Sequence, residues 1–135
     1  MPSIEDLPIK RKIIVFHCES ALKGKDLENH KDKFPEVGFV KLSCTGRLNP
    51  VVAFKALVEG VGAIIIYGCP LNDCHNFDGN MFAKRRVFAA QSVAEALGVD
   101  PERLSYVQKD PFDYGVLTRE ISAMKRKLDS MGVEA

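Results

Sequence analysis

Cysteine thiols are the side chains of this sequence best suited to chemistry, because thiolates bind metals and clusters and exchange disulfides. The 135-residue chain has four of them, Cys18, Cys44, Cys69 and Cys74. The segment 1–12 contains charges and prolines in place of the apolar core of an export signal, so we expect a cytoplasmic protein with reduced thiols. Three interpretations remain: buried apolar cysteines, ligands of a metal or cluster, or a redox-active thiol pair.

The spacing of the cysteines separates these interpretations in part. Structural zinc sites usually combine two closely spaced pairs, whereas here only Cys69 and Cys74 are close in sequence. A thiol–disulfide enzyme more often has C-x-x-C at a helix start, but Ala21 stands where that motif would be completed after Cys18. Spacing therefore favours an iron–sulfur cluster over zinc only modestly, and both stay open.

Composition and charge exclude several classes of function. The chain has 19 basic and 18 acidic residues and a net charge of +1, which gives no bulk attraction to nucleic acid or to an anionic membrane. Its longest apolar segment, 61–67, is far shorter than the roughly 20 residues that a membrane span needs. We expect neither nucleic-acid binding nor membrane insertion.

Alternating strand and helix patterns predict the elements that must position the cysteines. Short runs rich in β-branched and apolar residues predict strands at 12–16, 36–42, 62–67 and 104–107. Helices are predicted at 49–60, at 81–97, after Asp110-Pro111 and, in part, over 20–31. This order predicts one flavodoxin-like α/β domain over 1–135, with a parallel sheet, helices on both faces and an ordered core of about 12–131.

Two of the predicted helices have apolar stripes that should face the core. The stripe of helix 81–97 comprises Phe82, Ala89, Ala90, Val93, Ala94 and Leu97. The stripe of the last helix comprises Leu117, Ile121, Met124, Leu128 and Met131.

All four cysteines are expected in loops after predicted strands. Cys18, Cys44 and Cys69 each come two residues after a strand end, and Cys74 lies in the same loop as Cys69. In a parallel α/β sheet these loops share the carboxyl edge, where such folds place their sites. Core cysteines would lie inside strands or on helix stripes, so this placement favours a ligand role.

At this point the residues resemble a known family, the iron–sulfur delta subunits of methyl-viologen-reducing (F420-non-reducing) hydrogenases. The resemblance covers about 12–128. It is carried by Phe16-His17-Cys18, Cys44-Thr-Gly-Arg47, Gly68-Cys69, Asp73-Cys74-His75, Gly79-Asn80, Arg85-Arg86 and the segment 97–104.

The resemblance implies an electron-transfer subunit without turnover of its own. A [2Fe–2S] cluster would be held by Cys18, Cys44, Cys69 and Cys74, with Arg47 and His75 beside it. It would relay electrons between a heterodisulfide-reductase-A-like flavoprotein and a hydrogenase, formate dehydrogenase or other redox subunit. From their charge, Arg85 and Arg86 are expected to contact the thiolate site or an acidic partner surface, or simply to form the solvent-exposed face of their helix. His30 lies in a polar segment and is expected to be solvated.

Two departures from the family pattern keep alternatives open. Ala21 replaces a cysteine of the first site, and the loop 68–75 lacks a histidine and a glycine common in the family. Four cysteines are the minimum for an all-cysteine cluster. The alternatives are a cluster-free adaptor that docks the same partners and a zinc-stabilised domain, and metal content separates the three.

Overall fold

The computed structural model describes a central sheet and the helices around it. Described are residues 13–19, 21–42, 56–57, 61–68, 79–96, 98, 100–110, 112–113 and 115–130, with only the backbone given for 79–84.

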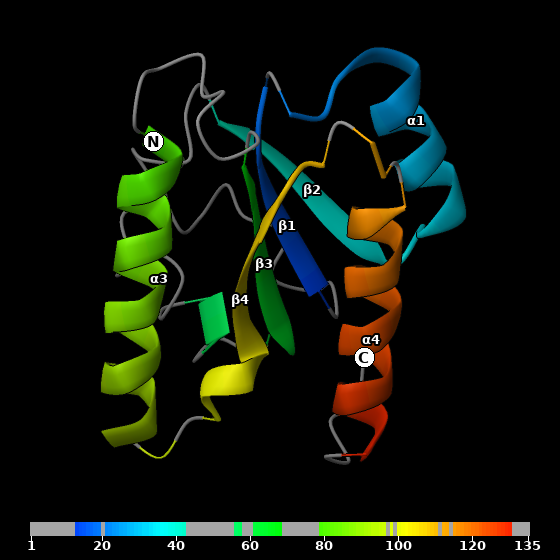
Figure 1. The fold of residues 1–135 in the computed structure, drawn as a ribbon. Coiled ribbons are helices and arrows are strands. Elements are labelled where there is room, and N and C mark those ends of the chain that lie inside the picture. The colour runs from blue at the N-terminus through cyan, green and yellow to red at the C-terminus, as the bar shows by residue number, and fades with distance from the viewer. Residues whose placement is uncertain are drawn as a thin grey trace.

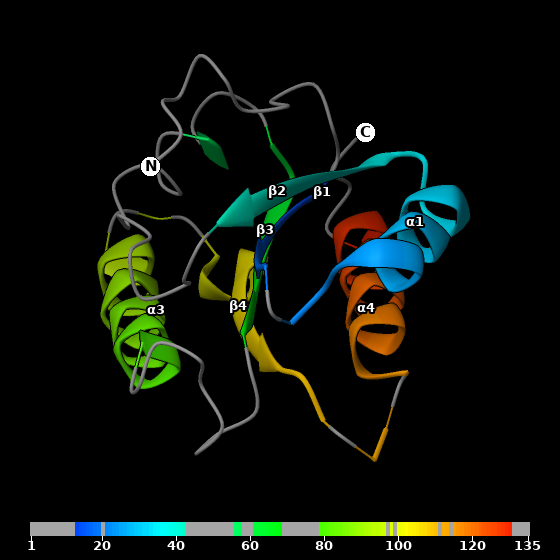
Figure 2. The same ribbon diagram turned by 90° about the horizontal axis from the view of Figure 1, so that it is seen from above.

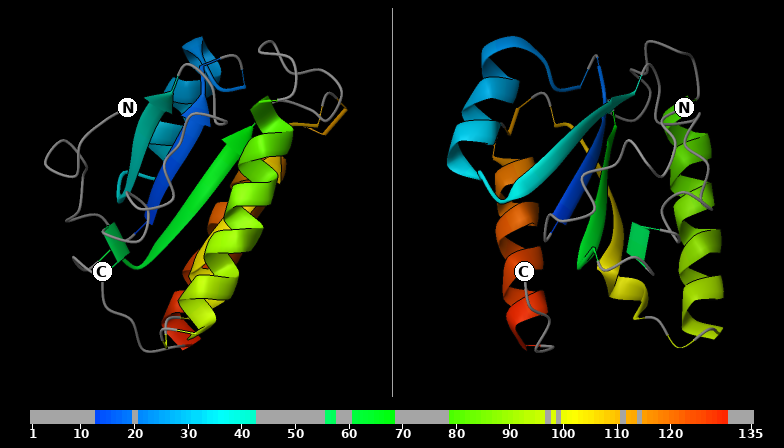
Figure 3. Two further views of the ribbon diagram at one scale, coloured as in Figure 1. Left: turned by 90° about the vertical axis from the view of Figure 1, so that its left-hand side faces the viewer. Right: turned by 180° about the vertical axis from the view of Figure 1, so that it is seen from behind.

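The sheet has four parallel strands in the order β2-β1-β3-β4. Its strands are β1 Ile13–Cys18, β2 Val37–Leu42, β3 Ala63–Gly68 and β4 Leu104–Gln108. All three strand pairs are parallel, so the strands end at one common edge (Figure 3, left). The predicted α/β class with a flavodoxin-like parallel sheet is confirmed.

Helices cover both faces of the sheet. They are α1 Gly24–Lys33, α3 Gly79–Ala96, the short 3-10 helix η3 Pro101–Arg103 and α4 Val116–Ser130. Helices α1 and α4 lie on one face and α3 on the other (Figures 1 and 2). Of the expected helix 49–60 the structure describes only Ala56 and Leu57, which are helical and buried.

The hydrophobic core lies on both sides of β1. Every residue of this strand is buried, as is typical of a central strand between two helical layers. Ile13 and Val15 pack towards the α4 side, whereas Ile14 and Phe16 pack with the residues under α3. In α4 the four buried residues are Leu117, Ile121, Met124 and Leu128, which confirms the predicted stripe within the described residues.

The start of α4 was predicted wrongly. The Asp110-Pro111 pair was expected to begin the helix, but α4 begins at Val116. The carboxylate of Asp110 instead accepts a hydrogen bond from the backbone N–H of Phe112 at 2.8 Å. Aspartate makes such local turns as readily as helix caps, so the same signal produced a turn.

The buried face of α3 agrees with the prediction in part, since Ala90 and Ala94 are buried as expected. Its buried residues in the described part are Val87, Ala90 and Ala94, whereas Ala89 is exposed and Val93 is 50% exposed. The helix has small and apolar residues on more than one side, so the pattern did not fix which side meets the sheet. Phe82 and Leu97 lie outside the described side chains.

Arg103 fixes the entry to β3 from the end of η3. Its guanidinium donates from Nε to the carbonyl of Gly62 at 2.6 Å and from Nη2 to that of Val61 at 3.1 Å. Replacing Arg103 by methionine is expected to lower the free energy of unfolding by about 1–3 kcal/mol, because both hydrogen bonds from a charged donor are lost. Urea denaturation measures the change.

The matched control for this prediction is Arg85→Met on the exposed side of α3. Surface substitutions usually change stability by less than about 0.5 kcal/mol. Equal effects of the two variants would show that the Arg103 hydrogen bonds add nothing to stability.

Candidate functional site at the carboxyl edge

The loops predicted to contain the cysteines begin at the carboxyl ends of neighbouring strands. Cys18 ends β1 and lies beside Leu42, the last residue of β2. The backbone N–H of Glu19 donates to the carbonyl of Leu42 at 2.9 Å, which extends this pairing beyond the strand. On the other side of β1, β3 ends at Gly68.

The chain therefore leaves β2 and β3 on either side of Cys18. Adjacent strands in a sheet are about 4.8 Å apart, so the ends of β2 and β3 are roughly 10 Å apart with Cys18 between them. Cys44 follows Leu42 by two residues and Cys69 follows Gly68 directly. Connections this short lead us to expect Cys44 and Cys69 near Cys18, although both lie outside the described residues.

Cys18 itself is not in a loop, so this part of the prediction was wrong. It is the last residue of β1, 1% exposed, and grouped with Ala21 and Leu22 in an apolar cluster. Strand β1 runs two residues further than predicted because His17 and Cys18 continue the pairing with β2. For this cysteine, the interpretation as a buried core residue is stronger than the sequence indicated.

The chain turns back over Cys18 directly after the strand. The backbone N–H groups of Ala21 and Leu22 donate to the carbonyl of Cys18 at 3.0 and 3.2 Å. Ala21 is 1% exposed and lies in the same cluster as Cys18. A C-x-x-C motif would bring two thiols together at this turn, and here a methyl group takes the second place.

His17 is a buried, neutral neighbour of this site. It is 1% exposed, and its ring meets the ring of Phe39 edge-on with centroids 6.4 Å apart. Burial lowers the pKa of His17 to about 4, because the imidazolium would lose its hydration. The ring is uncharged at neutral pH and contributes no positive charge next to Cys18.

Five of the six residues predicted for the site lie outside the described residues. They are Cys44, Arg47, Cys69, Cys74 and His75. Within the part of the chain that the structure describes, no three histidine, cysteine, aspartate or glutamate side chains gather closely enough to hold a metal ion. The four-cysteine ligand set and its Arg47 and His75 neighbours stay predictions.

Two other predictions concern polar residues away from this edge. His30 was expected to be solvated, but it is 7% exposed. Its Nδ1 lies 2.7 Å from the Asp26 carbonyl oxygen and its Nε2 lies 3.4 Å from the Thr118 hydroxyl, so it links α1 to α4. The polar sequence around His30 did not indicate that a distant segment, at Thr118, would cover its ring. Arg85 and Arg86 are exposed on α3, which is consistent with the solvent-exposed face of the helix and leaves a contact with a partner as a prediction.

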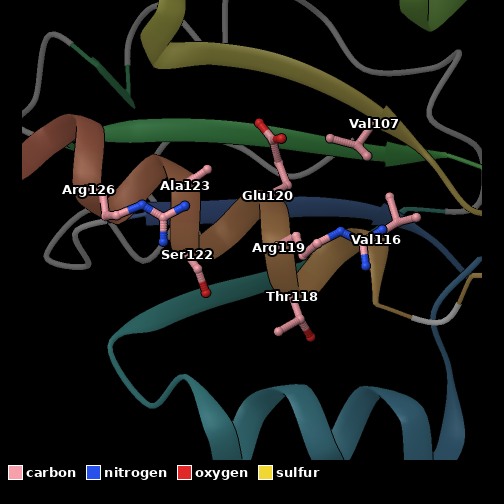
Figure 4. A pocket seen from close by; sticks show the side chains of 8 residues that line it. All are labelled: Val107, Val116, Thr118, Arg119, Glu120, Ser122, Ala123 and Arg126. Atoms are coloured by element: carbon pink, nitrogen blue, oxygen red, sulfur yellow. The ribbon is translucent and has the colours of Figure 1, made fainter.

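A groove of about 460 Å³ follows α4 beside the end of β4 (Figure 4). It is lined by Val107, Val116, Thr118, Arg119, Glu120, Ser122, Ala123 and Arg126. None of these is a predicted site residue, and the lining contains neither cysteine nor histidine. The groove therefore offers no thiolate or imidazole ligand.

No helix in the described segments is both long and apolar enough to cross a membrane.

These features define a small parallel α/β domain with a buried cysteine at the carboxyl edge of its sheet. Comparison with known protein families identifies the family to which this domain belongs. Residues 13–132 match the model of the family described as methyl-viologen-reducing hydrogenase, delta subunit. The chain belongs to this family, which confirms the resemblance found in the sequence.

Curated relatives agree with this assignment. The iron-sulfur subunit of the F420-non-reducing hydrogenase of Archaeoglobus profundus is 34% identical over 97 residues, covering 70% of this chain and 71% of the relative. The corresponding vhu iron-sulfur subunit of Methanopyrus kandleri is 37% identical over 95 residues, covering 68% and 72%. The A-type subunit of the ferredoxin:CoB-CoM heterodisulfide reductase of Methanosarcina mazei is 26% identical over 93 residues, covering 69% of this chain but only 12% of the relative. These relatives are named as subunits of redox complexes.

Proposed function

We propose that this protein is a one-electron relay that holds a [2Fe–2S] cluster on Cys18, Cys44, Cys69 and Cys74. The observation that carries the proposal is the position of Cys18 between the ends of β2 and β3, whose continuations contain Cys44 and Cys69. Thiolates are the ordinary ligands of such clusters. Membership of a family whose relatives are called iron-sulfur subunits supports the same cofactor.

One described feature of this edge supports the proposal, namely a thiol that is shielded from water. The group would supply reversible one-electron oxidation and reduction. Cys18 would supply one thiolate from a position already excluded from water. Ala21 and Leu22 pack beside it and hold its carbonyl in a turn, so Cys18 is fixed by both its strand and the turn. His17 remains neutral, and we expect Arg47 to supply positive charge next to the cluster.

The proposed partners follow from the relatives. The heterodisulfide reductase relative of Methanosarcina mazei contains a segment similar to this chain within one longer polypeptide. We propose that the present chain serves a heterodisulfide-reductase-A-like flavoprotein. The electron donor would be a hydrogenase, a formate dehydrogenase or another redox subunit.

The first experiment is metal analysis of the protein purified under strict anoxia. About two irons and two acid-labile sulfides per chain are expected, with a visible absorption band that bleaches and an EPR signal that appears on dithionite reduction. Zinc in place of iron would identify the zinc-stabilised domain. Folded protein in its native complex with neither metal would contradict the relay.

A cluster-free adaptor is the second candidate, and two observations favour it. Ala21 has no thiol at the second position of the turn, and Cys18 is buried among apolar residues as a core cysteine would be. An adaptor would keep the fold and the docking surface without iron. The same metal analysis therefore separates this candidate from the relay.

A further inference from the structure

Phe112 has a large apolar side chain that is exposed to solvent. It is 92% exposed, more than Phe88 at 58% and Val93 at 50%, the other large hydrophobic residues exposed in the described part of the chain. It lies in the segment between β4 and α4. Contact of its whole ring with water costs free energy in proportion to its apolar area. Burial against another surface would recover this free energy.

The exposure of Phe112 is not a consequence of a loose chain. Its backbone N–H donates to the Asp110 carboxylate at 2.8 Å, and the N–H of Asp113 donates to the Asp110 carbonyl at 3.3 Å. The Asp113 carboxylate accepts the Gly115 N–H at 3.0 Å and is ion-paired with Arg119 of α4. The backbone that carries the ring is therefore ordered before binding, which lowers the entropic cost of binding.

Gly115 leaves space for the ion pair between Arg119 and Asp113. A Cβ atom at this position would lie 2.8 Å from Nη1 of Arg119, so a larger residue would push the guanidinium away from Asp113. The ion pair also holds the pKa of the Asp113 carboxyl below its usual value, mainly through the hydrogen bond from Arg119. The carboxylate that organises the loop therefore stays charged.

The loop begins beside the end of β3. The N–H of Lys109, at its start, donates to the carbonyl of Gly68 at 2.8 Å. Gly68 ends β3 and directly precedes Cys69. A protein that bound Phe112 would thus approach the carboxyl edge of the sheet, where β3 ends and Cys69 follows in the sequence. Short distance between carriers is the requirement of a relay, so the placement suits a redox partner.

We propose that Phe112 is the anchor by which this chain docks on its flavoprotein partner, the ring entering an apolar pocket of that protein. The proposal rests on the proposed function for the identity of the partner. Aromatic side chains that fill pockets commonly dominate the affinity of an interface. The exposed Asp110 next to the ring predicts basic residues at the rim of the pocket.

The test is the dissociation constant between this chain and the heterodisulfide-reductase-A-like flavoprotein purified from the same organism, measured by calorimetry. Phe112→Ala is expected to raise Kd at least about tenfold, as for the loss of an anchor aromatic residue. Phe112→Leu keeps much of the apolar volume and should recover part of the affinity. Phe88→Ala on α3 removes the same side chain from another exposed place and should leave Kd unchanged.

The outcomes separate this proposal from the proposed function. Iron and sulfide content and the unfolding midpoint should be the same in the three variants as in the natural chain, because neither ring lies in the core. Unchanged affinity of Phe112→Ala, a larger loss in Phe88→Ala, or no binding by the natural chain would overturn the docking site while the iron content still decides the relay. Binding that depends on Phe112 in an iron-free protein would keep the docking site and support the adaptor.

Discussion

Replacement of Cys18 by alanine is expected to reduce the iron of the anoxically purified protein to the level of adventitious metal. Four thiolates are the minimum for an all-cysteine cluster, and this chain has only four cysteines. The loss of one ligand would leave an iron site open. Iron and sulfide per chain, together with the EPR signal after reduction, measure the result.

Ala21→Ser is the matched control for this substitution. Ala21 is as buried as Cys18 and lies in the same turn and the same cluster, so both changes disturb the same packing. The control should keep its iron, and circular dichroism should show that both variants are folded. Full iron in the Cys18→Ala protein would mean that Cys18 is a core residue and that the proposed ligand set is wrong.

Phe16→Ala is expected to destabilise the fold by about 3–5 kcal/mol, the cost of emptying a buried phenylalanine site. Phe16 is fully buried on the central strand β1 and packs with residues under α3 such as Ile64 and Ile66. A loss of this size is a large part of the roughly 5–15 kcal/mol that stabilises an ordinary domain. The unfolding midpoint should fall by roughly 10–20 °C in a thermal scan of the metal-free protein.

Phe88→Ala makes the same chemical change at a position that is 58% exposed. Its effect should stay within about 1 kcal/mol, since most of the ring is already in contact with water. Similar losses in the two variants would show that β1 does not lie between two packed layers. The comparison thus tests the fold independently of any metal.

The strand pattern made the fold readable from the sequence. The four strands have runs of β-branched and apolar residues that match a period of two or full burial, and each is present within two residues of its predicted bounds. Because the strands alternate with helices, and because crossover connections between parallel strands are right-handed, few sheet topologies are possible. The stripe of α4 was equally clear, since its buried residues recur at steps of three and four.

Contacts between distant segments explain the predictions that were wrong. Cys18 belongs to β1 because Leu42 on β2 continues the pairing, and the local sequence contains no sign of that partner. His30 is buried because Thr118, far along the chain, lies next to its ring. In α3, Ala90 and Ala94 were predicted correctly, but only the packing against the sheet decided that Val87 is buried and Val93 exposed.

The candidate site divides in the same way. The sequence by itself determined the residue types, the four cysteines and their flanking motifs, and with them the family. Only the tertiary structure decided that Cys18 is a shielded strand residue and that β2 and β3 end on either side of it. The tertiary structure also decided that Phe112 is exposed to solvent, in a loop whose first residue, Lys109, is hydrogen-bonded to Gly68. Chemistry depends on residue type, which the sequence states directly, whereas burial and proximity depend on which distant segments meet.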